Sequence, residues 1–321
     1  MILRDLPLIA GPELTFEDVY GPAFGGLAAV AWGVTAIGCA NARLKLRGTT
    51  LAAPAAWAAV AAAVLAIVEA TLASRGDSLS ELTRSAWRFA AAAGTFCPPM
   101  AVLGAKRPQD RGWQWIVASL WVVIALPAIQ TALTPAGDRM ELSVLWTGFL
   151  LVIAAYGAIL NYGPTRFIWA SALYFLGQAA LIAPATKWQP ALPWFDNAWA
   201  CLGALLLLAA WIAARVASGR APERFGGNVD PATLQPTARW LAFRDAYGLS
   251  WGLRVLHRVN ETAALAGWPV RLAWHGFVDA AALAETSASA VQEEQKDLSP
   301  ETAAAVHATL DSLLRRFERN T

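Results

Sequence analysis

The sequence predicts an all-α, polytopic membrane protein with seven transmembrane helices and a small, mainly helical C-terminal domain. Hydrophobic residues make up 57% of the 321 residues and charged residues only 15%, whereas about a quarter of an average soluble domain is charged. The hydrophobic residues form runs close to the roughly 17 to 25 residues that a helix needs to cross a bilayer. Short loops rich in Lys and Arg separate alternate runs, which is typical of cytoplasmic loops.

The predicted spans are uniformly apolar over most of their length. A closed β-barrel is the other structure that can span a membrane, but its strands are shorter and alternate between polar and apolar residues. We therefore expect helices. The seven spans are roughly residues 22–40, 51–73, 88–105, 113–134, 142–162, 167–184 and 194–216.

The distribution of basic residues predicts the orientation of the spans. Ten Lys and Arg residues follow the odd-numbered spans: Arg43, Lys45, Arg47, Lys106, Arg107, Arg111, Arg166, Arg215, Arg220 and Arg224. The opposite side carries six, among many acidic residues: Arg4, Arg75, Arg84, Arg88, Arg139 and Lys187. Basic residues favour the cytoplasmic side. We expect an outside N-terminus and a cytoplasmic C-terminus in the plasma (inner) membrane of a bacterium.

The composition divides the chain into four parts. Residues 1–20 lack the features of a cleavable signal peptide and are predicted to be a short non-cytoplasmic tail. Residues 21–216 form the membrane domain, and 217–236, rich in Gly, Pro and Ala, form a linker. Residues 237–321 form a cytoplasmic, mainly helical domain in which 279–298 is either helix or loose linker. A domain this small has a marginal core alone, so it should dock on the membrane domain, on lipid or on another chain.

Four polar residues in the outer halves of the spans are candidates for a ligand site. Glu69, Gln130, Gln178 and Asp196 could line an outward-facing polar pocket, because ionisable groups inside membranes are often functional. The alternative is structural. Glu69 would then pair with Arg88 or Arg84, and each glutamine would bond a neighbouring helix.

A second candidate is the helix break at Cys97, Pro98 and Pro99. Two prolines remove two N–H donors and free the carbonyls near Gly94 and Thr95. Broken helices bind substrates or ions in many transporters. Kinked helices also occur for packing alone, and both interpretations remain open.

Basic and aromatic residues form a third group of candidates, for contact with lipid or a partner: Lys106, Arg107, Arg111, Arg244, Trp251, Arg254 and Arg258. The loop residues among them could hold anionic headgroups, or could serve only to set the orientation. The aromatic and basic face of 239–258 could lie at the bilayer surface or contact a protein. No nucleic-acid-binding motif accompanies it.

The sequence carries no motif of a known catalytic or cofactor-binding site. It lacks GxxxxGK[ST], HExxH, GxSxG and CxxC. Its three histidines follow the last span and its three cysteines have no paired spacing, so we expect no haem, metal or other cofactor. The seven-helix plan resembles that of the microbial rhodopsins, but the seventh span has no lysine to hold retinal, which excludes that family.

These observations favour a protein that is not an enzyme, because a paired nucleophile and base are missing. The first hypothesis is a membrane subunit or scaffold whose cytoplasmic helices dock a partner protein or a second copy of the chain. The alternative is a small-molecule transporter or sensor that uses the polar residues around Glu69 and the broken third helix.

Overall fold

The computed structural model describes residues 16–75, 78–106, 110–187, 193–220, 233–280 and 298–318. The predicted tail before residue 16, most of the predicted linker and most of 279–298 lie outside these ranges.

The described chain is mainly α-helical, as predicted. Five of its helical segments are long and apolar enough to cross a membrane: 23–45, 52–75, 111–133, 168–185 and 196–218. The bundle contains α1 (Phe16–Lys45), α2 (Ala52–Arg75), α3 (Glu81–Ala92), η2 (Ala93–Phe96), α4 (Cys97–Leu103), α5 (Asp110–Leu133), α6 (Val144–Ala155), η3 (Tyr156–Leu160), α7 (Ile168–Ile182), η4 (Ala183–Ala185) and α8 (Pro193–Ser218). This is the architecture of an α-helical membrane protein.

The outer surface of the bundle is apolar. Large hydrophobic side chains point outward along its helices, including Trp115 (79% exposed), Leu145 (87%) and Trp169 (77%). Soluble proteins rarely expose continuous apolar surface on this scale. Such a surface is suited to contact with the lipid of a membrane.

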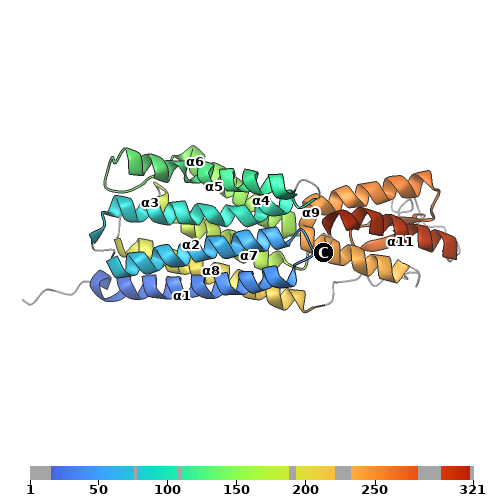
Figure 1. The fold of residues 1–321 in the computed structure, drawn as a ribbon, viewed down its shortest axis with the longest axis horizontal. Helices are drawn as coiled ribbons and strands as arrows, with labels where there is room; N and C mark the ends of the chain where they lie inside the picture. The colour runs from blue at the N-terminus through green and yellow to red at the C-terminus, as the bar shows by residue number, and fades with distance from the viewer. Residues whose placement is uncertain are drawn as a thin grey trace, which may run out of the picture.

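The loops of the bundle lie alternately at two ends (Figure 1). We call the end with residues 46–51, 104–106 and 161–167 the docking end, because the C-terminal domain contacts it. The far end carries residues 78–80 and 134–143, where Met140 N–H bonds Ser85 and Arg139 bonds Asp196. Segments α3, η2 and α4 together connect the far end to the docking end, alongside α2.

Three helices begin at serines that act as N-caps. The hydroxyl oxygens of Ser80, Ser143 and Ser299 each accept a hydrogen bond from the backbone N–H three residues later. A cap of this kind satisfies one of the N–H groups that the first helical turn leaves without a partner. These serines therefore fix where α3, α6 and the last long helix start.

The C-terminal domain has a helical core with one short hairpin. It comprises α9 (Leu234–Leu265), β1 (Val270–Ala273), β2 (Gly276–Asp279), α11 (Pro300–Leu314) and η6 (Arg315–Phe317). The strands are antiparallel, with Val270 opposite Asp279 and Ala273 opposite Gly276. Apolar residues alternate along it at Trp268, Val270, Leu272 and Trp274, a pattern that is typical of strands. Gly276 has a φ of 132° in its turn, which favours glycine.

Aromatic side chains fill the core between α9 and the end of the chain. The rings of Phe243 and Tyr247 stack at 4.7 Å, and Phe317 packs against both of them and against Trp251. Trp240 is completely buried. Because aromatic rings bury much apolar surface per residue, this cluster gives a small domain a sizeable core.

The C-terminal domain docks tightly on its own membrane domain. The indole N–H of Trp251 donates to Val102 O at 2.9 Å, and that of Trp274 donates to Pro164 O at 2.8 Å. Gly248 has a φ of 74° and lies so close to Asn161 that an added Cβ would be 2.4 Å from the Asn161 amide nitrogen. A glycine is therefore required at this kink in α9.

Thr50 joins three parts of the chain at the docking end. Its buried hydroxyl lies 2.9 Å from Ala105 O, 3.0 Å from the Tyr247 hydroxyl and 3.2 Å from Phe317 O. Thr50→Val keeps the shape but leaves a buried acceptor without a donor, which costs about 1 to 3 kcal/mol. We expect a lower thermal midpoint for the detergent-solubilised protein in near-ultraviolet circular dichroism.

Thr49→Val is the matched control for this prediction. The Thr49 hydroxyl donates only locally, to Leu46 O, so its loss should change the midpoint little. Equal midpoints for the two variants would show that the Thr50 hydroxyl does not hold the domains together.

Candidate functional site

The proline pair leaves one carbonyl deep in the bundle without its intrahelical donor. In an α-helix the Thr95 carbonyl would accept from residue 99, but Pro99 has no N–H. The Tyr174 hydroxyl donates to Thr95 O at 2.5 Å, and the Gln178 side-chain amide donates to it at 3.1 Å. Because lipid offers no donors, such a carbonyl must be satisfied by neighbouring helices. Two side chains of α7 do so.

The break is a change of helical form rather than an unwound loop. Residues 93–96 form a 3-10 turn, in which Cys97 N–H bonds Gly94 O, and α4 continues from Cys97. The facing segment, η3, is a π-helix turn. Gly157 in that turn lies against Pro99, since an added Cβ would be 2.8 Å from the proline Cβ. The two irregular segments therefore pack directly on one another.

A cavity of about 520 Å³ lies inside the bundle beside this break. Six segments surround it in a closed ring, each packed against the next: α1, α2, α4, η3, α7 and α8. Ligand pockets commonly have volumes of roughly 300 to 1,000 Å³. The cavity is therefore large enough for a small organic molecule.

The walls of the cavity are largely apolar. Alanines and other apolar residues dominate, and the hydroxyls of Thr35, Ser171 and Ser218 donate to carbonyls in their own helices. The Tyr162 hydroxyl donates to Ala246 O at 3.4 Å. The wall hydroxyls thus have backbone partners before any ligand arrives.

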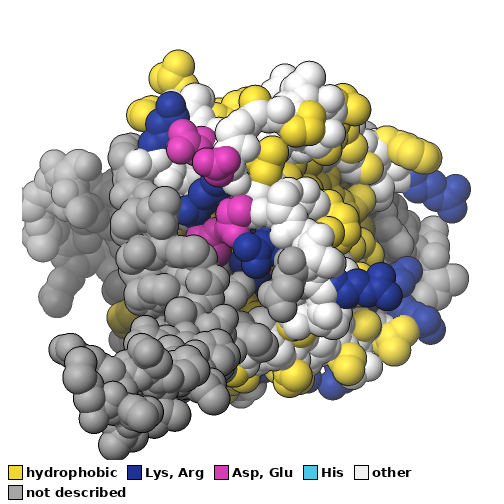
Figure 2. Space-filling view, turned by 90° about the vertical axis from the view of Figure 1, so that its left-hand side faces the viewer, with side chains coloured by type: hydrophobic (Ala, Val, Ile, Leu, Met, Phe, Trp, Pro, Cys, Tyr) yellow, Lys and Arg dark blue, Asp and Glu magenta, His cyan; other side chains and the backbone are white. Residues whose placement is uncertain are grey.

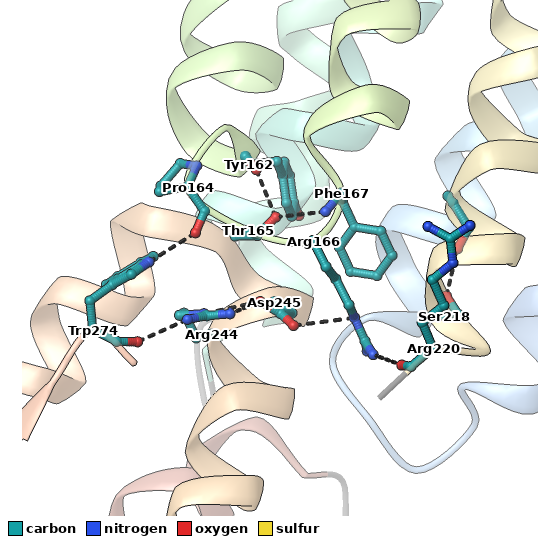
Figure 3. Close-up of polar contacts among 11 residues, drawn as sticks. Tyr162, Pro164, Thr165, Arg166, Phe167, Ser218, Arg220, Arg244, Asp245 and Trp274 are labelled. Carbon is teal, nitrogen blue, oxygen red and sulfur yellow. Dashed lines mark hydrogen bonds and ion pairs between the residues drawn. The ribbon is translucent and has the colours of Figure 1, made fainter. Parts of the chain in front are cut away.

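The docking end of the cavity carries its charged residues. Asp245, from α9, is fully buried between two arginines (Figure 3). Its Oδ1 accepts from Arg244 Nε at 3.0 Å and from Nη2 at 2.7 Å. Its Oδ2 lies 3.2 Å from Nε of Arg166, whose Nη1 donates to Arg220 O. Arg166 and Asp245 both line the cavity.

The far end carries a separate network of ion pairs, and Figure 2 shows acidic and basic side chains gathered on that face. Arg88 Nε and Nη2 donate to the two oxygens of Glu69, both at 3.0 Å, and Nη2 also lies 2.5 Å from Asn197 Oδ1. Arg139 donates to Asp196 at 2.6 Å and to Pro184 O. These contacts join α2, α3, α8 and residues 134–143.

The four residues predicted to form one polar pocket lie in three places. Glu69 and Asp196 belong to the far-end ion pairs, where Arg88 and Arg139 neutralise them. Gln178 lies deeper and bonds Thr95. Gln130 is exposed on α5 and joins neither group. Glu69 thus makes the Arg88 pair foreseen as the structural alternative.

The residues predicted to contact lipid or a partner also separate. Arg244 and Trp251 are buried at the docking end. Arg254 is exposed and stacks on the Trp251 ring at 4.7 Å, while the exposed Arg258 pairs with Glu261. Lys106 is half-buried, Arg111 is exposed, and Arg107 lies outside the described residues.

Sequence reasoning missed the cavity and the roles of Tyr174, Arg166 and Asp245. Arg166 was grouped with the basic loop residues that set the orientation or hold anionic headgroups, without its partner Asp245, which was not singled out. The sequence does contain a signal for Asp245, because Arg244 and Asp245 form a charged pair within an otherwise aromatic helix face. A charge in such a face needs a buried partner.

Comparison of the chain with protein-family models, with curated proteins and with solved structures finds no match. Its function has to be inferred from the geometry of the site.

The Glu69–Arg88 pair should be important for stability. Glu69→Gln leaves the largely buried Arg88 without its counter-charge, and breaking a buried pair from one side costs about 3 kcal/mol or more. We expect a clearly lower thermal midpoint. Adding Arg88→Met to Glu69→Gln should restore part of the loss, because no buried charge then remains unpaired.

Glu261→Gln is the control, since its pair with Arg258 is exposed and such pairs contribute under about 1 kcal/mol. If Glu69→Gln unfolds like the wild type but abolishes binding or transport of a solute, the residue has a functional role instead.

Proposed function

We propose that the chain is a seven-span membrane sensor that holds a small, mainly apolar molecule inside its bundle and reports its presence to the C-terminal domain. The observation that carries this proposal is the cavity of about 520 Å³, which touches both the broken helix and α9. The site differs from the outward polar pocket around Glu69 that the sequence suggested. It lies deeper and extends to the docking end.

The contribution of α9 to the cavity wall favours sensing. Asp245 and Ala246 line the cavity, although both belong to the C-terminal domain. Next to them, Tyr247 bonds Thr50, and Gly248 forms the kink against Asn161. A molecule that changes the packing at Asp245 therefore acts directly on the contacts that hold the domain in place. A ligand shifts an equilibrium only through such differential contacts.

Seven membrane crossings are also part of the proposal. At about 1.5 Å per residue, residues 81–103 extend about 34 Å and Val144–Leu160 about 25 Å. The hydrocarbon core of a bilayer is roughly 30 Å thick. Together with the five longer helices, these two segments give seven crossings. The basic docking end is then cytoplasmic and the N-terminus is outside, in a bacterial plasma membrane.

Cysteine labelling in whole cells tests this topology. Asp138→Cys lies in an exposed far-end loop, and His257 is exposed on α9. In a background where the three buried native cysteines are replaced by alanine, a membrane-impermeant maleimide should label Asp138→Cys in intact cells. It should label His257→Cys only after permeabilisation. The reverse pattern would invert the proposed orientation.

Filling the cavity tests whether it holds a molecule. Ala58 lines it from α2, so Ala58→Phe would place a large side chain in the cavity. We expect mass spectrometry of an organic extract of the purified protein to detect a molecule that is strongly reduced in Ala58→Phe. The exposed position Val60 on the same helix provides the control, Val60→Phe, which should keep it. An extract of Ala58→Phe identical to that of the wild type would contradict the proposal.

A docking scaffold is the second candidate function. Two leucines on the second half of α9, Leu253 (50% exposed) and Leu265 (91%), favour it. The aromatic face that first suggested a partner gives weaker support, because Trp240, Tyr247 and Trp251 pack within the chain itself. Co-elution of a stoichiometric partner that is lost in Leu265→Glu would support the scaffold.

A further inference from the structure

Charge is distributed unevenly along the cavity. Among the described residues that line it, Arg166 and Asp245 are charged, and both lie at the docking end. Toward Pro98 and Pro99 the walls are apolar, and their hydroxyls donate to backbone carbonyls. A molecule that fits these walls has an apolar body and one polar end.

Among the described residues, the charged end has an excess of positive charge. Arg244 and Arg166 bring two positive charges to the single negative charge of Asp245. Arg244 already forms two hydrogen bonds to Asp245 and a third to Trp274 O at 2.9 Å. A cationic head at this end would lie beside the Arg166 guanidinium, with Arg244 one ion pair further away behind Asp245, in a medium of low dielectric constant where like charges repel strongly. An anionic head would compensate the excess.

Arg166 has unused donors for such a head. A guanidinium carries five N–H groups in a planar fork that suits carboxylate and phosphate oxygens. Within the described chain, Nη1 of Arg166 donates to Arg220 O at 2.6 Å and its Nε lies 3.2 Å from Asp245 Oδ2 in the ion pair, which leaves N–H groups of the fork for a further acceptor. The indole N–H groups of Trp32 and Trp211, two further lining residues, lack partners there. These N–H groups can donate to an anionic head and have nothing to offer a cationic one.

We propose that the cavity binds an anionic amphiphile, with a carboxylate or phosphate head beside Arg166 and an apolar chain that extends along the ring of helices toward Pro98 and Pro99. This inference rests on the proposed function, since it names the class of molecule that the sensor takes. A free fatty acid and an acidic lipid share this chemistry. The head then competes with Asp245 for Arg166, which links occupancy of the cavity to the docking of α9.

Direct binding of single-chain probes tests the proposal. The full-length protein in phosphatidylcholine nanodiscs is titrated with radiolabelled hexadecanoate, hexadecyl phosphate, hexadecanol or hexadecyltrimethylammonium. Binding to Ala58→Phe, whose cavity is filled, is subtracted as partition into the bilayer, and Ala58→Leu serves if the larger side chain prevents folding. Hexadecanoate represents free fatty acids and hexadecyl phosphate represents phosphate-containing lipids. The acid that binds more tightly shows whether the cavity prefers a carboxylate or a phosphate head.

We expect both acids to bind about tenfold more tightly than hexadecanol, because their heads form charge-assisted hydrogen bonds. The ammonium probe should bind more weakly than hexadecanol. Arg166→Gln should lower the affinity for the acids about tenfold, whereas Arg166→Lys, which keeps the charge, should retain part of it. Arg166→Gln should still fold, since Asp245 keeps its two bonds to Arg244. Val60→Phe should match the wild type.

Two failures can be told apart. If no probe shows binding that Ala58→Phe removes, the proposed function and this inference fail together. If hexadecanol or the ammonium probe binds as tightly as the acids, or if Arg166→Gln leaves the acids unaffected, the anionic class is wrong while a molecule in the cavity still stands. The ammonium comparison needs Ala58→Phe only for the subtraction of bilayer partition, and it does not depend on how Arg166→Gln behaves.

Discussion

The arrangement of the bundle depends on the need to satisfy every backbone polar group away from water. Pro98 and Pro99 leave the Thr95 carbonyl without its helical donor, and α7 supplies Tyr174 and Gln178 instead. These bonds fix α7 to the broken segment across the middle of the bundle. Helix α7 also packs on α8, and α8 packs on α1. The bonds to the Thr95 carbonyl therefore help to position several walls of the cavity. A proline pair that would weaken an isolated helix thus becomes a connection between helices.

The C-terminal domain is held by a different kind of contact. Asp245 is a fully buried carboxylate that joins Arg244 of its own helix to Arg166 of the membrane domain. A buried charge of this kind is costly unless it is well paired, so its environment must be maintained by both domains. The kink at Gly248 and the bonds of Thr50 and Trp251 bring α9 close enough for that pairing. Domain docking and the charge at the end of the cavity are therefore parts of one structure.

The sequence predicts the helical class and the long spans because apolar length and loop charge are local properties. The start of α11 is local in the same way, because Ser299 followed by Pro300 is a helix-start signal. Partners across the bundle are not local. The pocket predicted around Glu69 assumed that four residues at similar depth face one another, but depth does not set rotation about the helix axis. Gln130 therefore faces outward, and Trp251 turns into the docking contact rather than toward lipid.

The two ends of the bundle differ in how completely their charges are paired. At the far end, the described acids Glu69, Glu81 and Asp196 each have one arginine, so the ion pairs close that end without excess charge. At the docking end two described arginines, Arg166 and Arg244, share the one carboxylate of Asp245. An electrostatic field of one sign attracts the opposite charge over distances beyond direct contact. Under the proposed function, an anionic molecule in this cavity is drawn to the end formed by α9, where its binding would alter the docking of the C-terminal domain.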